Sequence, residues 1–193
     1  MKKIERIYRE ILYQVLEKNQ HFITQKSLSN KCGVSIGNVN HSLNPLESIN
    51  SIEKKPRGFR VINPKKILLY WASIRNLNKD IIYQTFSKKT VQEIEKSMPE
   101  CIFTAYSGFK FTFNSIPSDY SVKIHYADKD EVERRFPKND LKPNIFVLKT
   151  DEHLKKFKQI SIAQLFVDLW NINTWYAQEF LKALEAKIDG ILE

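Results

Sequence analysis

The chain is poor in cysteine, with only Cys32 and Cys101 among its 193 residues. Two cysteines that lie far apart and form no Cys-x-x-Cys pattern exclude a disulfide framework and favour reduced, buried thiols in a cytoplasmic protein. The four histidines show no metal-ligand spacing with one another or with the cysteines. We therefore expect no metal site and no cofactor.

Long apolar segments are also missing. The longest apolar stretch, residues 67–72, is far too short to cross a bilayer. The opening Met1-Lys2-Lys3 is not followed by the apolar core of a signal peptide. We see no internal repeat and no low-complexity tract, and we expect a soluble, cytoplasmic protein with no membrane partner.

Acidic residues are scarce in one part of the chain only. The chain has 31 Lys and Arg against 22 Asp and Glu, a formal net charge of +9. Residues 1–77 carry 14 basic and 5 acidic residues, whereas residues 78–193 carry 17 of each, so the whole excess lies in the first segment. A segment this basic attracts polyanions, either nucleic acid or an acidic membrane surface. Hydrophobic residues at 42% exclude a wholly disordered chain.

The chain opens with apolar residues at helical spacing. They run from Ile4 to Leu16 and form one stripe, which predicts an amphipathic helix. Four charged residues lie off this stripe, and the simplest interpretation is a solvated face: Lys3, Arg6, Arg9 and Glu10.

Two further helices are marked by their caps. Thr24 can cap a short helix over residues 25–31, and Gly33 can supply the tight turn that follows. Ser35 can cap the next helix in the same way. The apolar residues of that helix share one face: Val39, Leu43 and Leu46.

A hairpin and a fourth helix complete this segment. Strands over residues 51–55 and 59–62 flank the turn 55–58, Lys-Pro-Arg-Gly, where proline in second place and glycine in fourth place suit a type I turn. The tip of this hairpin is basic. A strongly apolar helix then follows over residues 65–77, with Pro64 in its first turn.

This order of helix, helix, turn, helix and hairpin is typical of a winged helix-turn-helix. Residues 28–40, Leu-Ser-Asn-Lys-Cys-Gly-Val-Ser-Ile-Gly-Asn-Val-Asn, resemble the core of many bacterial and archaeal regulators. Residues 56–60, Pro-Arg-Gly-Phe-Arg, resemble a wing. Together with the charge, the resemblance predicts that residues 1–77 form a DNA-binding domain whose partner is double-stranded DNA.

The site residues follow from how such domains bind. A recognition helix presents its N-terminal residues to base edges in the major groove, where asparagine can pair with adenine and serine or histidine can reach bases or phosphates. The predicted residues of this helix are Ser35, Ile36, Gly37, Asn38, Asn40 and His41. Wing cations and the start of the second helix would meet the phosphate backbone or the minor groove. These residues are Lys54, Lys55, Arg57, Arg60, Gln25 and Lys26.

Two interpretations without DNA recognition stay open. Asn38 and Asn40 can be merely solvated polar residues. The winged helix can also mediate protein contacts alone, although the charge of the segment argues against this.

Signals for helix and strand alternate through the rest of the chain. We expect residues 78–89 to be a linker and residues 90–193 to form a small mixed α/β domain for partner binding or oligomerisation, which makes the chain α+β. Residues 122–126 alternate as a strand with one buried face does. A final helix over residues 174–188 should end at Gly190.

The second domain carries a resemblance of its own. Its strand-helix-strand order and residues 164–170, Gln-Leu-Phe-Val-Asp-Leu-Trp, resemble the C-terminal domains of AbiEi-type antitoxins and related archaeal winged-helix regulators. Such domains are described as nucleotidyltransferase-like. The resemblance implies a repressor whose C-terminal domain neutralises a toxin-like partner or holds a homodimer together.

The catalytic residues of that fold are incomplete. Its chemistry needs a Gly-Ser turn and an Asp-x-Asp pair, because two magnesium ions require carboxylates at fixed positions. The nearest match is Ser107-Gly108, in reversed order, followed by Asp119-Tyr120-Ser121 with a serine in place of the second acid. We expect a degenerate domain that is not an enzyme, in which Asp119 forms a turn with Ser118.

Other conspicuous side chains in this domain have structural interpretations. Asp168 lies among apolar residues of a helix, where a buried carboxylate paired with a local donor is the favoured interpretation. Four aromatic residues at helical spacing are more often core residues than the lining of a ligand pocket: Trp170, Trp175, Tyr176 and Phe180. Arg134 and Arg135 fit a solvated helix end.

The sequence thus favours a sequence-specific transcriptional regulator. One alternative is a nucleotidyltransferase with a nucleic-acid-binding appendage. Another is a ligand-responsive regulator whose aromatic-rich second domain senses a small molecule.

Overall fold

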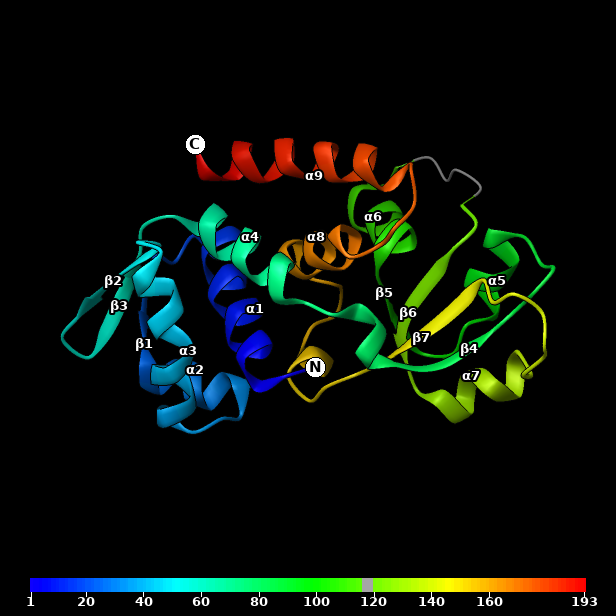
Figure 1. The fold of residues 1–193 in the computed structure, drawn as a ribbon, viewed down its shortest axis with the longest axis horizontal. Coiled ribbons are helices and arrows are strands. Elements are labelled where there is room, and N and C mark those ends of the chain that lie inside the picture. The colour runs from blue at the N-terminus through cyan, green and yellow to red at the C-terminus, as the bar shows by residue number, and fades with distance from the viewer. Residues whose placement is uncertain (116–119) are drawn as a thin grey trace.

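The computed structural model describes residues 1–115 and 120–193. Helices and two separate sheets build the molecule, which confirms the predicted α+β class. The smaller sheet lies at one end of the long axis and the larger sheet at the other, with α1, α4 and α8 between them (Figure 1). No helix in the described part of the chain is long and apolar enough to cross a membrane.

The N-terminal part, residues 3–74, has the predicted order of elements. They are α1 (Lys3–Leu16), β1 (Phe22–Thr24), α2 (Gln25–Cys32), α3 (Ile36–Ser48), β2 (Ile52–Lys55), β3 (Gly58–Val61) and α4 (Pro64–Ile74). The predicted caps are confirmed, because Thr24 Oγ1 accepts from the Ser27 amide at 3.2 Å and Ser35 Oγ accepts from the Asn38 amide at 3.2 Å. Gly33 has a φ of 63°, in the left-handed region that glycine adopts without strain.

The hairpin differs from the prediction in two respects. The sheet has a third strand, β1, which pairs antiparallel with β3 and was not predicted because it is only three residues long. The turn is not of type I, since Arg57 at its third position has a φ of 68°. A positive φ there is the mark of a type II turn. The basic tip of the wing is therefore held in a conformation that favours glycine or asparagine.

The C-terminal part, residues 77–193, contains the larger sheet. Its elements are η1 (Leu77–Asp80), β4 (Ile81–Thr85), α5 (Val91–Ser97), β5 (Cys101–Phe103), α6 (Ala105–Phe113), β6 (Lys123–Ala127), α7 (Lys129–Arg135), β7 (Ile145–Lys149), η2 (Leu154–Lys156), α8 (Ile162–Trp170) and α9 (Ala177–Leu192). The strand order is β4-β7-β6-β5, in which β6 and β7 are parallel and the outer pairs antiparallel.

Three local predictions in this part are wrong. Residues 81–85 of the expected linker form β4, which pairs with β7. The strand β6 is buried on both faces, because it lies inside the sheet between two helical layers. The last helix continues through Gly190 to Leu192, so this glycine does not end it.

One hydrophobic core joins the two parts of the molecule. The larger of two buried clusters runs from the winged helix, through Trp71 of α4, to α8 and α9. The smaller cluster lies on the other face of the larger sheet, beneath α5 and α7, around Ile145 and Val147. The last two helices, although late in sequence, therefore pack with the winged helix: α8 contacts α1 and α4, and α9 contacts α1 and α8 and lies above α4 and α8 in Figure 1.

Buried charges also connect the two parts, which corrects the prediction of a solvated face on α1. Arg9 is 0% and Glu10 4% exposed. The guanidinium of Arg9 donates to Asp151 Oδ1 at 2.6 Å and to His153 Nδ1 at 3.0 Å, while His153 Nε2 lies 2.8 Å from Glu10 Oε2. Helical periodicity predicted that Arg9 and Glu10 are exposed to solvent. Residues 151–153 cover that side of α1, and periodicity carries no information about such distant residues.

A second buried cluster surrounds Asp168. Its Oδ2 accepts from Thr104 Oγ1 at 2.8 Å and from Tyr126 Oη at 2.7 Å, and its Oδ1 lies 3.5 Å from Arg75 Nε. The prediction of a buried carboxylate with local donors is confirmed. Gln164 joins the two clusters, because it accepts from Arg9 and donates to Asp168 at 2.8 Å.

Candidate nucleic-acid interface

The two helices of the helix-turn-helix are linked across their exposed sides. Gln25, the first residue of α2, donates from Nε2 to Oδ1 of Asn40 on α3 at 3.2 Å. This places the start of α2 beside the N-terminal half of α3, as a winged helix requires if both are to meet one duplex. Lys26 follows Gln25 and is exposed.

The helix α3 separates its residues by face. Val39, Leu43 and Leu46 are fully buried. The opposite face is exposed and is made by Ile36, Gly37, Asn40, His41 and Asn44. Because this face is free of the core and carries amides, an imidazole and an apolar side chain, it can present hydrogen-bonding groups and a methyl contact to base edges.

The structure divides the predicted asparagines. Asn40 is exposed, whereas Asn38 is half-buried and donates from Nδ2 to Ser35 Oγ at 2.9 Å. Asn38 therefore supports the N-terminal cap of α3 with its side-chain amide. Ser35 itself is exposed, but its oxygen is occupied by the cap.

Asn44 is a candidate that the sequence prediction left out of the site. It is exposed on the same face as Asn40, one helical turn further on, and its Oδ1 lies 3.4 Å from Lys54 Nζ on the wing strand β2. Its spacing from Asn40 could have identified it, because residues four apart lie on one side of a helix.

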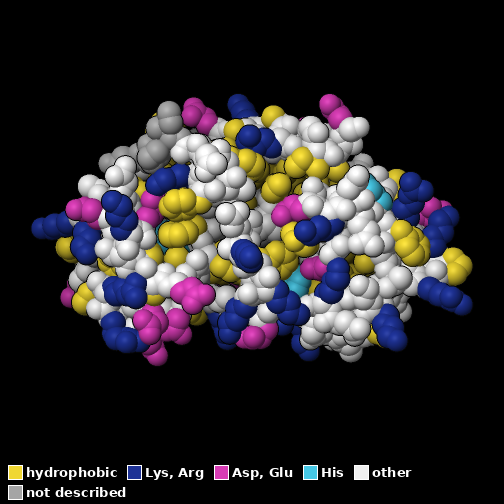
Figure 2. Space-filling model, turned by 180° about the vertical axis from the view of Figure 1, so that it is seen from behind, with side chains coloured by type: hydrophobic (Ala, Val, Ile, Leu, Met, Phe, Trp, Pro, Cys, Tyr) yellow, Lys and Arg dark blue, Asp and Glu magenta, His cyan; other side chains and the backbone are white. Residues whose placement is uncertain are grey.

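The wing carries two kinds of cation. Lys54 and Lys55 are paired with Glu47 and Glu53, respectively. Arg57 and Arg60 are exposed, and within the described residues neither forms an ion pair. The arginines are thus the wing cations that keep an uncompensated charge for phosphates. Lys and Arg side chains project from the wing end of the molecule, at the right of Figure 2.

No metal-binding constellation accompanies this interface in the described part of the chain. No group of three His, Cys, Asp or Glu residues there could hold a metal ion. His125 is fully buried, and burial together with nearby Lys123 lowers its pKa to about 3. The ring therefore stays neutral at physiological pH.

The residues that come nearest to the transferase motif do not form a phosphate-binding turn. Ser107 and Gly108 lie inside α6, where Ser107 Oγ is 3.0 Å from Tyr120 Oη and a Cβ on Gly108 would lie 2.9 Å from the Phe103 carbonyl oxygen. Ser121 Oγ is 2.9 Å from Tyr176 Oη. Asp119 and Ser118 fall outside the described residues.

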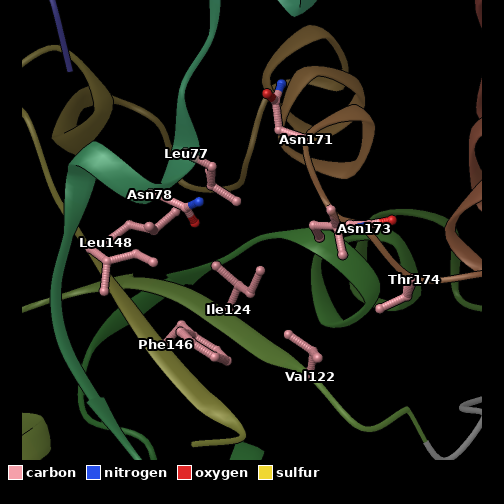
Figure 3. Close-up of a pocket in the computed structure, with 11 residues that line it drawn as sticks. Leu77, Asn78, Val122, Ile124, Phe146, Leu148, Asn171, Asn173 and Thr174 are labelled. Carbon is pink, nitrogen blue, oxygen red and sulfur yellow. The ribbon is translucent and has the colours of Figure 1, made fainter.

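An apolar pocket of about 180 Å³ lies against the larger sheet. Figure 3 shows its floor of apolar side chains from β6 and β7, among them Ile124 and Phe146, and the amides of Asn78, Asn171 and Asn173 around it. Of the four aromatic residues predicted to be core, Tyr176 and Phe180 pack against the core, whereas the two tryptophans are exposed, which corrects the prediction for them. Trp175 is 83% and Trp170 46% exposed, because they flank the loop between α8 and α9.

These features define a winged-helix DNA-binding protein. The model of the family described as Firmicute plasmid replication protein (RepL) matches residues 2–107, more than half of the chain, and the chain belongs to this family. RepL proteins are winged-helix proteins that bind DNA. A search of the curated proteins found no match, and a search of the solved structures found none. The predicted likeness of the C-terminal part to AbiEi-type or nucleotidyltransferase-like domains receives no support from these comparisons.

Proposed function

We propose that this protein binds a specific double-stranded DNA sequence and serves the replication of a plasmid through that binding. The observation that carries the proposal is the exposed face of α3 beside the wing arginines, in a chain of the RepL family. A transcriptional regulator would also need to bind a specific DNA sequence. The family described as a plasmid replication protein favours a role in replication over a role in transcription. No observation favours a toxin-like partner.

Base reading is assigned to the N-terminal half of α3. Asn40 can pair in the major groove with an adenine, and His41 can donate to a guanine or a phosphate. Ile36, 50% exposed in the first turn, is suited to a thymine methyl group. Gly37 lies between them and has no side chain, so the backbone can approach the duplex closely there.

Anchoring is assigned to the surrounding cations and amides. Arg57 and Arg60 on the wing, with Lys26 at the start of α2, would contact phosphates on either side of the groove. Such contacts release counterions, so the affinity should fall with salt for any sequence. Sequence preference then comes from α3 alone. The contribution of base contacts to affinity can therefore be measured separately from that of phosphate contacts.

The test is selection of a binding site from random duplexes with the full chain. Titration follows against the selected duplex and a scrambled duplex at several salt concentrations. The proposal expects a preferred site that also occurs on the plasmid carrying the gene, bound at least about 1000-fold more tightly than the scramble. Equal affinity for both duplexes would refute sequence recognition. A preferred site at promoters only would favour the regulator.

We also propose that the protein does not transfer nucleotides. This is supported by the position of Ser107 and Gly108 inside a helix and by Ser121 at the place of the second acid. Incubation with labelled nucleotides and magnesium or manganese tests it. Label incorporated into protein, RNA or DNA, and abolished by Asp119→Ala, would establish an enzyme instead.

A further inference from the structure

A cleft of about 450 Å³ lies where the winged helix meets the C-terminal part. One side is formed by α1 and the C-terminal end of α2, and the other by residues 153–157. Its volume is in the range of small-molecule sites. The residues that line this cleft are not among those of the proposed DNA-binding face, and the cleft lies outside the hydrophobic core.

The rim of the cleft is positively charged. Lys18, Lys31 and Lys156 line it against one carboxylate, that of Glu10. Glu10 is already engaged, because Gln14 donates to Oε1 at 2.6 Å and His153 lies 2.8 Å from Oε2. Three cations around one bonded carboxylate favour an anionic ligand.

The lysines come from different segments and converge. Lys31 Nζ lies 3.2 Å from Glu10 Oε1, and Lys156 Nζ donates to the carbonyl oxygen of Lys31 at 2.7 Å. The side chain of Lys31 keeps 44% of its surface exposed, so its ammonium can also contact a ligand. Residues 31 and 156 are brought together only by the packing of the two parts of the chain.

The wall beside these lysines is aromatic. The rings of Tyr13 and Phe157 meet edge to face with centroids 4.7 Å apart, and both are partly exposed. Lys18 Nζ lies 5.3 Å from the centroid of Tyr13. A flat ring that enters here would find both aromatic contact and a cation close to it.

We propose that this cleft binds a nucleotide, with its phosphates on Lys31 and Lys156 and its base against Tyr13 and Phe157. Lysine supplies the point charge for phosphate, and every nucleobase has a face that aromatic side chains can contact. Binding does not depend on magnesium, because the single carboxylate in the cleft is taken by protein donors.

The cleft is separate from the DNA-binding face of α2. Lys31 is six residues beyond Gln25, which at about 1.5 Å per residue puts it about 9 Å further along the helix. Because α1 belongs to the winged helix and residues 153–157 belong to the C-terminal part, a bound nucleotide contacts both. It therefore stabilises this arrangement of the two parts against unfolding.

Calorimetric titration of the full chain with ATP in EDTA tests the proposal, with adenosine and tripolyphosphate as fragments. Saturable binding of ATP is expected, tighter than either fragment. Absence of ATP binding up to millimolar concentrations would overturn the proposal. Equal affinity for tripolyphosphate would overturn it too, because the site would then be a general anion patch.

Variants locate the site. Lys156→Ala should weaken ATP binding about tenfold, and Tyr13→Leu should weaken ATP but not tripolyphosphate. The matched control is Lys155→Ala, since Lys155 is paired with Glu152 and does not line the cleft. Unchanged affinity in Lys156→Ala would refute the location. Displacement of ATP by the selected DNA duplex would refute a site separate from the DNA-binding face.

Discussion

Arg9 Nη2 lies 2.6 Å from Asp151 Oδ1, so a buried ion pair joins the first helix of the DNA-binding part to the segment before η2. Both side chains are almost fully buried. Arg9 also donates to His153 and Gln164, which belong to the C-terminal part as well. The position of the winged helix against the rest of the protein is thus set by directional contacts as well as by apolar packing.

Removal of Arg9 should lower the folding stability. Arg9→Met keeps the volume of the side chain but removes the closer of the two cations beside buried Asp151 and leaves Arg6 Nε at 3.7 Å, so the cost should be at most about 3–5 kcal/mol. Urea denaturation followed by circular dichroism measures the free energy of unfolding. Arg134→Met is the control, because Arg134 is exposed and its ion pair with Glu131 lies at the surface. A loss no greater than that of the control would show that the ion pair contributes little.

The same cluster should make the protein sensitive to acid. Burial alone would raise the pKa of Asp151 and of Glu10, but Arg9 outweighs it for Asp151 and hydrogen bonds from His153 and Gln14 outweigh it for Glu10, so both pKa values are lowered. Burial lowers the pKa of His153. All three groups bind fewer protons folded than unfolded, so stability falls as the pH decreases.

The decrease should begin below about pH 6.5, the unfolded pKa of histidine, and steepen below about pH 4.3, where the unfolded carboxylates gain protons. Asp168 acts in the opposite direction, since burial raises its pKa. Urea midpoints between neutral and acid pH measure the effect. In Asp151→Asn the steep part should be smaller. A midpoint independent of pH in the wild type would contradict the assignment.

Gly37→Ala should separate folding from DNA binding. A Cβ at Gly37 would meet only Ser35 Oγ, at 3.9 Å, and alanine is favoured over glycine in a helix by about 0.5–1 kcal/mol. The variant should therefore be slightly more stable. If the backbone at Gly37 lies against the duplex, the added methyl group should weaken binding to the selected site. Equal affinity would show that α3 does not approach DNA at this residue.

Asn40→Ala should reduce discrimination between the selected duplex and the scramble by about 1–3 kcal/mol while sparing affinity for the scramble. Asn38→Ala should instead act through the helix cap, because its amide is bonded to Ser35. Its loss should lower stability and erode specificity less. Wild-type discrimination in the Asn40 variant would mean that α3 is wrongly placed as the recognition helix.

Arg57→Ala should weaken binding to both duplexes alike and reduce the slope of log affinity against log salt by about one. The reason is that this exposed arginine forms no ion pair within the described residues and is free for a phosphate. Lys129→Ala is the control, since Lys129 lies on α7 and pairs with Glu133. If the salt slope does not change, the hairpin is not a wing that contacts DNA.

The sequence by itself determined the elements of the winged helix and which side of α3 faces away from the core. Its signals are local: the caps at Thr24 and Ser35, the glycine turn at Gly33 and the apolar spacing of α3 each depend on residues only a few positions apart. Short-range hydrogen bonds and helical periodicity depend on neighbouring residues alone, which is why these caps and this turn were predicted at the residues where the structure has them.

Only the tertiary structure decided what lies against α1. Arg9 and Glu10 read as solvated residues because their partners, Asp151 and His153, lie more than 140 positions away in the sequence. The strand β4 was missed for the same reason, since its hydrogen bonds go to β7. Burial of a charge is favourable only when a partner arrives with matching geometry, and long-range packing alone supplies that partner. The cleft between Lys31 and Lys156 is a product of the same packing.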